Sequence, residues 1–231
     1  LRIMRAFRFA SQLNFKVDES IIIASKEMRK RLSIVSQERI TDEFLKIIAS
    51  PKPSIGLKLL FDSGVLEIVF PEIAVMAGVD QRKDYHHKDV FLHTLQVVDN
   101  ISIETNNIWL RFAALVHDIA KPPTKKFVEG IGWTFHGHEE LGARMMKKIF
   151  HRMKLPLHQL EYIQKLVRLH LRPIALAKEE VTDSAIRRFV VSAGEDLEEL
   201  IILCRADITS KNPIKVEKYL GNYERVMQKV R

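Results

Sequence analysis

Glycine and proline are scarce in this chain, and that scarcity is the strongest constraint on its fold. The 231 residues include only 9 glycines and 8 prolines, about 7 % of the chain, where ordinary usage is nearer 12 %. Sandwiches, barrels and hairpin arrays need these residues at their tight turns, whereas helix interiors exclude them. Strand-like alternation is not sustained, and only residues 127–135, around Gly130 and Gly132, are compatible with a small hairpin. The sequence therefore predicts an all-α fold.

The amino-acid composition excludes several classes of protein and indicates the cellular compartment. Hydrophobic residues make up 46 % and charged residues 29 %, which excludes a disordered chain. The single cysteine, Cys204, excludes a disulfide framework and a cysteine-type zinc site. A chain with one cysteine is expected in a reducing, cytoplasmic setting. No apolar run approaches the ~18 residues of a membrane span, so we expect no membrane partner. The chain opens on Leu1 and closes within a helical pattern, so we expect it to be part of a longer protein.

Helical patterns fall into two groups on either side of a polar stretch at residues 77–88. We therefore expect a small helical domain over 1–78 and a second helical domain over 79–231. The helices expected in the first domain cover residues 1–15, 17–31, 36–49 and 54–63. Those expected in the second cover residues 89–103, 109–121, 138–151, 157–170, 182–193 and 196–209, with a last one from about 213.

Six titratable residues of the second domain are candidates for the chemistry. They are His93, His117, Asp118, His138, His170 and Asp207. All but His138 fall inside expected helices with apolar neighbours, where an unpaired carboxylate is costly to bury. A shared cation offsets that cost, because it needs neutral imidazoles and ionised carboxylates. The nearby His136 competes with His138 for the same role, and the position of His138 at a helix start slightly favours it.

The sequence motifs around these residues resemble those of the HD superfamily of metal-dependent phosphohydrolases. They read FLHTLQVVDN, FAALVHDIAKP, FHGHEELGA, LVRLHLRP and CRADITS, over about residues 85–210. The resemblance implies an HD-type helical bundle in which a metal is held by His93, His117, Asp118 and Asp207. It implies that His138 and His170 complete a second metal position or reach the substrate phosphate, and that Lys121 contacts a phosphate oxygen. His117, Asp118 and Lys121 are then the expected catalytic residues. Mixed imidazole and carboxylate ligands suit Mn, Fe, Ni, Co or Zn, with Mg a further possibility.

Three sequence segments in the amino-terminal region resemble a second family. LRIMRAFRFASQLNF, SQERITDEFLKIIAS and GLKLLFDSGVLEIVFPEI are similar to the neck of bacterial tRNA nucleotidyltransferases and poly(A) polymerases. The resemblance implies a preceding head domain that uses Mg and CTP or ATP. It implies that Arg2 reads the incoming base, while Arg5 and Arg8 brace the pocket or contact phosphate. It also implies that Glu38 and Arg39, with Glu43, support that pocket. Composition alone would favour a solvated arginine stripe. Without a head, we expect the 231 residues not to add CMP or AMP to RNA.

The net charge of +8 fits tRNA or another RNA as partner, because basic clusters bind phosphate independently of sequence. Aromatic residues make up only 8 % and are not interleaved with the basic runs, so we expect no base-by-base reading of single strands.

The favoured interpretation is that the chain is the neck and HD region of a CCA-adding or poly(A)-adding enzyme that acts at tRNA 3′ ends. The alternatives are a non-catalytic RNA-positioning module and a stand-alone HD phosphohydrolase. The sequence leaves open CCA versus poly(A) synthesis, the identity and number of metals, the natural HD substrate and the oligomeric state.

Overall fold

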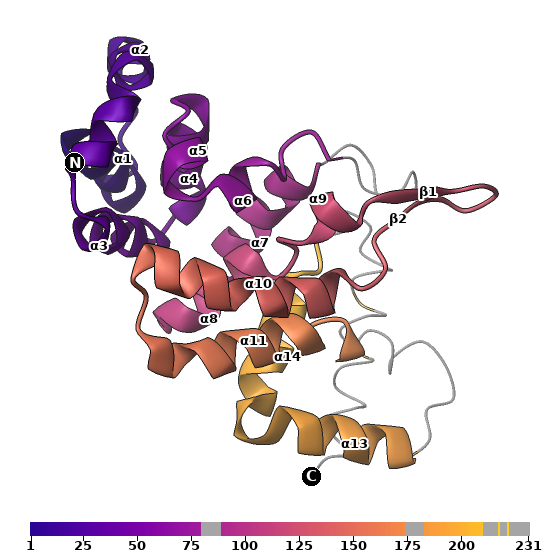
Figure 1. The fold of residues 1–231 in the computed structure, drawn as a ribbon. Coiled ribbons are helices and arrows are strands. Elements are labelled where there is room, and N and C mark those ends of the chain that lie inside the picture. Colours follow the sequence, from indigo (N-terminus) through magenta and orange to yellow (C-terminus); the bar gives the residue numbers. More distant parts are fainter. Residues whose placement is uncertain (80–88, 174–182, 210–216, 218–220, 222–231) are drawn as a thin grey trace.

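The computed structural model describes residues 1–79, 89–173, 183–209, 217 and 221, and these residues are mostly helical (Figure 1). The all-α prediction is confirmed. The first group of elements is α1 (Arg2–Leu13), α2 (Glu19–Met28), a 3-10 helix (Arg29–Ile34), α3 (Gln37–Ile48), α4 (Pro53–Asp62), α5 (Leu66–Val69) and α6 (Pro71–Ala74). Among the helices of the described ranges, none is long and apolar enough to cross a lipid bilayer.

The second group surrounds the candidate site. It comprises α7 (Val90–Glu104), α8 (Ile108–Val116), α9 (Lys121–Thr124), β1 (Lys126–Val128), β2 (Gly132–Thr134), α10 (His138–Met153), a 3-10 turn (Leu157–Gln159), α11 (Leu160–Leu169), α13 (Asp183–Ala193), a second 3-10 turn (Gly194–Asp196) and α14 (Leu197–Ala206). The two strands pair antiparallel with Phe127 opposite Trp133, so the small hairpin is confirmed. Of the helix expected from about residue 213, only residues 217 and 221 are described, so this helix stays a prediction.

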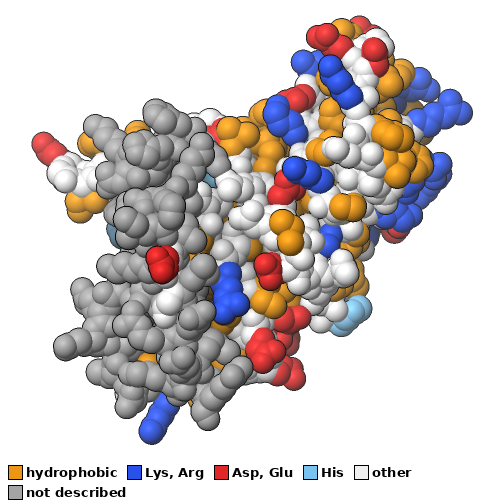
Figure 2. Space-filling view, turned by 180° about the vertical axis from the view of Figure 1, so that it is seen from behind, with side chains coloured by type: hydrophobic (Ala, Val, Ile, Leu, Met, Phe, Trp, Pro, Cys, Tyr) orange, Lys and Arg blue, Asp and Glu red, His pale blue; other side chains and the backbone are white. Residues whose placement is uncertain are grey.

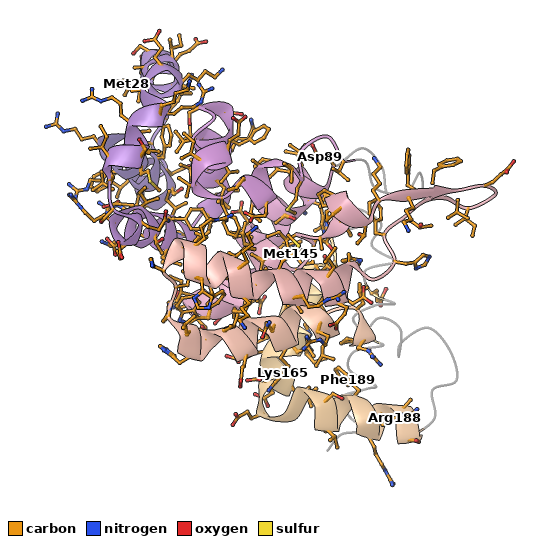
Figure 3. All side chains as sticks on the ribbon, in the orientation of Figure 1. Met28, Asp89, Met145, Lys165, Arg188 and Phe189 are labelled. Carbon is orange, nitrogen blue, oxygen red and sulfur yellow. The ribbon has the colours of Figure 1, made fainter. Side chains whose placement is uncertain are left out.

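Asp89 fixes the start of α7. One carboxylate oxygen accepts a hydrogen bond from the Leu92 backbone N–H at 2.7 Å, which caps the helix. The other accepts from the Gly78 backbone N–H at 2.7 Å. Figure 3 labels this residue where the first group of helices meets the second. One side chain thus anchors both sides of residues 80–88.

A single hydrophobic core runs across the expected domain boundary at residue 78. The Phe70 ring lies 6.2 Å from Phe112 and 5.8 Å from Phe44, and the buried apolar residues on both sides form one cluster. Arg111, at 3 % exposure, donates to the carbonyls of Ile48 and Ser50. Continuous packing of this kind holds the two groups of helices in a fixed relation, although the boundary itself stays a prediction.

Candidate metal centre

Four of the six candidate residues lie at the ends of helices. His93 lies within α7, but His117, His170 and Asp207 occupy the C-cap positions of α8, α11 and α14. His138 is the first residue of α10. Figure 1 shows α10, α11 and α14 converging with α7 in the middle of the molecule. Helices far apart in sequence thus bring their ends, and these side chains, to one place.

The expectation that His117 and Asp118 lie inside a helix over 109–121 is wrong. The helix α8 ends at Val116, and the next four residues form a turn in which the Ile119 and Lys121 backbone N–H groups donate to carbonyls three residues earlier. Pro122 is favoured in the first turn of a helix because its missing N–H is not needed there. It therefore starts a new helix, α9, at Lys121 and leaves the His-Asp pair on the turn.

Three histidines share one local arrangement that orients the ring. In His117, His138 and His170, Nδ1 lies 2.6–2.8 Å from the carbonyl oxygen three residues earlier. A carbonyl can only accept, so Nδ1 carries a proton, and in the neutral ring Nε2 is then the nitrogen that presents a lone pair. For His117 and His170 the carbonyl belongs to the last turn of α8 or α11, where carbonyls have no helical partner. For His138 it belongs to Phe135, in the segment between β2 and α10. The backbone therefore sets both tautomer and direction.

The first group of possible ligands comprises His93, His117 and Asp207. Asp207 Oδ1 lies 2.9 Å from His93 Nε2 and 3.3 Å from His117 Nε2. One donor atom from each residue lies within 4.8 Å of the others. His93 is oriented differently from the other histidines, because its Nδ1 lies 3.0 Å from Thr209 Oγ1 rather than a carbonyl.

The second group comprises Asp118, His138 and His170, again with donor atoms within 4.8 Å of one another. Asp118 Oδ1 lies 3.2 Å from His138 Nε2 and 3.8 Å from His170 Nε2. Its other oxygen, Oδ2, lies 3.2 Å from His117 Nε2 and 2.7 Å from Lys121 Nζ. Asp118 therefore stands between the two groups, with one oxygen toward each.

The charges of the cluster shift its titration strongly. Burial alone would lower the pKa of His117, but the carboxylates of Asp118 and Asp207 outweigh it and raise that pKa to about 10. Burial and the neighbouring His117 lower the pKa of His170 to about 3. Burial would raise the pKa of each carboxyl, yet His117 and, for Asp118, Lys121 hold both well below the usual range. The centre thus holds two carboxylates, which favours a cation.

The residues present fit a divalent metal. His117 Nε2 is buried and makes no hydrogen bond of good geometry, and the buried Asp118 Oδ2 makes none besides its ion pair with Lys121. Such an arrangement costs free energy unless another group satisfies these atoms. Imidazole nitrogen and carboxylate oxygen together suit Mn, Fe, Co, Ni or Zn, whereas Mg prefers oxygen ligands throughout. Between the two candidates for one position, the structure brings His138 into the cluster and leaves His136 exposed.

Two supporting residues escaped the sequence reasoning. Thr209 faces His93 Nδ1, and its only sequence signal is its place in the word CRADITS. Gly142 on α10 lies where a Cβ would stand 3.1 Å from Val167 Cγ1 and 3.6 Å from Ile119 Cγ2. The absence of a side chain lets α10 approach α11 and the turn that carries Asp118.

The expected nucleotide-binding residues of the neck separate into two sets. Glu43 is buried, and its oxygens lie 3.0 Å from Arg5 Nε and 3.2 Å from Arg8 Nη1. This buried acid with two arginines gives α1 and α3 a fixed polar contact and argues against a purely solvated stripe. The side chains of Arg2, Glu38 and Arg39 are exposed.

Comparison with known proteins assigns the two regions. Residues 14–76 match the family described as "Probable RNA and SrmB- binding site of polymerase A", and residues 84–212 match the HD domain. The chain is 29 % identical to a CC-adding tRNA nucleotidyltransferase of Thermus thermophilus, over 99 % of this chain and 54 % of that protein.

Two further relatives extend the comparison. The chain is 31 % identical to an A-adding tRNA nucleotidyltransferase of Deinococcus radiodurans, over 90 % of this chain and 48 % of that protein. It is 28 % identical to a multifunctional CCA protein of Vibrio campbellii, over 95 % of this chain and 55 % of that protein. The chain spans about half the length of these curated relatives. Since the HD domain match alone covers more than half of its residues, the chain belongs to the HD domain family, with an RNA-binding region of the poly(A) polymerase type preceding the HD domain.

Proposed function

We propose that the six-residue cluster binds divalent metal and hydrolyses phosphoesters at RNA ends, within a protein of tRNA 3′-end processing. The observation that carries this proposal is the convergence of four histidine Nε2 atoms on the buried carboxylate of Asp118 and the partly buried carboxylate of Asp207. One ion would be held by His93, His117 and Asp207 and another by His138 and His170, with Asp118 available to both. Asp118 Oδ2 has an ion pair with Lys121 but, like His117 Nε2, no hydrogen bond of good geometry, and a bound ion would satisfy both atoms.

A bound divalent ion would supply Lewis-acid activation of the phosphoester and of water. Hydrolysis adds OH to phosphorus and H to the leaving oxygen, so a 2′,3′-cyclic phosphate gives a monoester and a free hydroxyl. Lys121 is the side chain of this chain that we assign to the phosphate. Its Nζ lies 2.7 Å from Asp118 Oδ2, and a cation at that place stabilises negative charge that develops on phosphate oxygens.

Metal content and hydrolysis test the proposal directly. We expect the purified chain to retain one or two transition-metal ions and to hydrolyse 2′,3′-cAMP with Mn²⁺, Ni²⁺ or Co²⁺. His117→Ala and Asp118→Ala should each lower bound metal severalfold and lower kcat at least a hundredfold. His136→Ala is the matched control, because this histidine is exposed and outside the cluster. Absence of metal in the wild-type chain, or unchanged metal content in both variants, would contradict the proposal.

The second candidate function is a non-catalytic one, the positioning of RNA, and contacts in the neck region favour it. Glu43 holds Arg5 and Arg8 in a compact polar group beside the exposed Arg2 and Arg39, which suits the positioning of RNA or nucleotide. Under this reading the metal cluster stabilises the bundle only. Metal binding without hydrolysis in any of Mn²⁺, Ni²⁺, Co²⁺ and Mg²⁺ would select it.

For the whole protein, we propose tRNA nucleotidyltransferase activity with CTP or ATP and Mg²⁺. This proposal is supported by the similarity to CC-adding, A-adding and multifunctional CCA proteins. On the same hypothesis, the nucleotide pocket includes five residues of the neck: Arg2, Arg5, Arg8, Glu38 and Arg39.

A further inference from the structure

The β1–β2 hairpin stands out from the helical body and presents apolar side chains to water. Figure 1 shows it extending away from α9 and α10, and Figure 3 shows side chains projecting from it. Phe127 is 65 % exposed, Ile131 61 % and Trp133 40 %. Large apolar side chains gathered on one exposed element indicate a contact surface.

One face of the hairpin carries aromatic rings together with lysines. Phe127 and Trp133 are opposite each other in the register, and their ring centroids lie 5.3 Å apart in an edge-to-face arrangement. Lys125 Nζ lies 4.4 Å from the centroid of the Trp133 ring. A cation beside an exposed aromatic pair suits a ligand that has both flat rings and negative charge.

The same row leads to the metal centre. Phe135 directly follows β2, two residues after Trp133. Lys121 Nζ lies 5.7 Å from the Phe135 ring centroid and 2.7 Å from Asp118 Oδ2. The Phe135 carbonyl also accepts from His138 Nδ1. Rings and lysines therefore alternate from the hairpin to the cluster.

We propose that this row binds an unpaired segment of RNA and delivers its end to the metal centre. It is defined by Phe127, Trp133 and Phe135 together with Lys121 and Lys125. Bases stack on aromatic side chains whatever their identity, while lysines bind the intervening phosphates. Charge complementarity selects RNA over a protein partner, because each end of the row has a lysine beside a ring. The inference rests on the proposed function for the role of the delivered phosphoester, but RNA binding by the row is measurable without hydrolysis.

Binding is read from the fluorescence of Trp133. In a Trp109→Phe background, Trp133 is the remaining tryptophan of the chain. We expect a short single-stranded RNA to quench its emission saturably, and Phe127→Ala to weaken that binding about 5- to 100-fold. Lys125→Ala should weaken it less and reduce its salt dependence. Val128→Ala is the matched control, because Val128 pairs with Gly132 at the neighbouring position of the same hairpin and points to the opposite face. Absence of quenching, or equal affinity in Phe127→Ala and wild type, would overturn the inference in favour of a protein partner for this face.

Kinetics separate this inference from the proposed function. With an RNA oligonucleotide ending in a 2′,3′-cyclic phosphate, Phe127→Ala and Trp133→Ala should raise KM at least fivefold at unchanged kcat. With glycerol 1,2-cyclic phosphate, which has no base, both variants should match wild type. Quenching without any hydrolysis would contradict the proposed function and leave the RNA row standing. Hydrolysis with an unchanged KM in both variants would contradict the row alone.

Discussion

At the scale of the residue, His117 decides how the centre takes up an ion. Its folded pKa of about 10 lies above the ordinary value near 6.5. The metal-free imidazole is therefore protonated at pH 8, whereas His170, with a pKa of about 3, is already neutral. Metal needs the neutral ring, so binding has to displace a proton from His117. Metal affinity should rise with pH, by up to about tenfold per unit, until pH approaches 10.

Calorimetry in two buffers of different ionisation enthalpy measures that proton directly. We expect close to one proton released at pH 8 for the ion that His117 binds. In the metal-free protein the raised pKa stabilises the fold fully below about pH 6.5. That contribution is lost as pH rises toward 10, so the chelated protein should become less stable across this window. Metal binding at pH 8 with no proton release would show that His117 is neutral.

At the scale of the element, the contact of α4 with α1 and α3 depends on Gly56. A Cβ there would stand 2.5 Å from Ser11 Oγ and 2.7 Å from Ile47 Cγ2, and the Gly56 N–H donates to Ser11 Oγ at 2.7 Å. Gly56→Ala therefore has to push the helices apart, although alanine is the better helix former. We expect a loss of about 1–3 kcal/mol in the free energy of unfolding, measured by urea denaturation.

Lys58→Ala is the control for this helix. Lys58 is exposed and pairs with Asp62 on the solvent side of α4, and a surface pair of this kind is worth about 0.5 kcal/mol or less. A Gly56→Ala protein as stable as Lys58→Ala would mean that α1 and α4 do not pack as closely as described.

At the scale of the whole molecule, the excess of basic side chains predicts RNA binding that weakens with salt. Figure 2 shows Lys and Arg side chains gathered over the end formed by the first helices, where Lys30 and Arg31 lie in the 3-10 helix after α2. The affinity of the chain for tRNA should fall linearly with salt on logarithmic axes. Lys30→Gln with Arg31→Gln should make the slope shallower by up to about two phosphate contacts, as measured by filter binding.

A charge-preserving exchange, Lys30→Arg with Arg31→Lys, controls for shape. It should keep the wild-type slope, because the counterion effect depends on charge rather than on hydrogen-bond geometry. A slope near zero in the wild type, or equal slopes in the neutralised and exchanged proteins, would remove this end of the molecule as an RNA surface.

The sequence by itself determined what depends on neighbouring residues. The scarcity of glycine and proline specified helices, the pair Gly130 and Gly132 specified the hairpin, and both are present. The resemblance to the two families was also recognisable from the sequence, because it lies in short contiguous motifs. These features follow from backbone propensity and local spacing, which the linear order of residues contains.

Only the tertiary structure decided the features that depend on residues far apart in the sequence coming together. The division of six ligands into two groups, with Asp118 between them, requires the ends of α8, α11 and α14 to meet beside α10. The contacts of lysines with aromatic rings also depend on packing, while the expectation of no base-by-base reading of single strands stays a prediction. Lys121 and Lys125 reach Phe135 and Trp133 across the hairpin, although the residues are separated along the chain. Contacts of this kind arise from packing and strand pairing, and sequence spacing does not encode their distances.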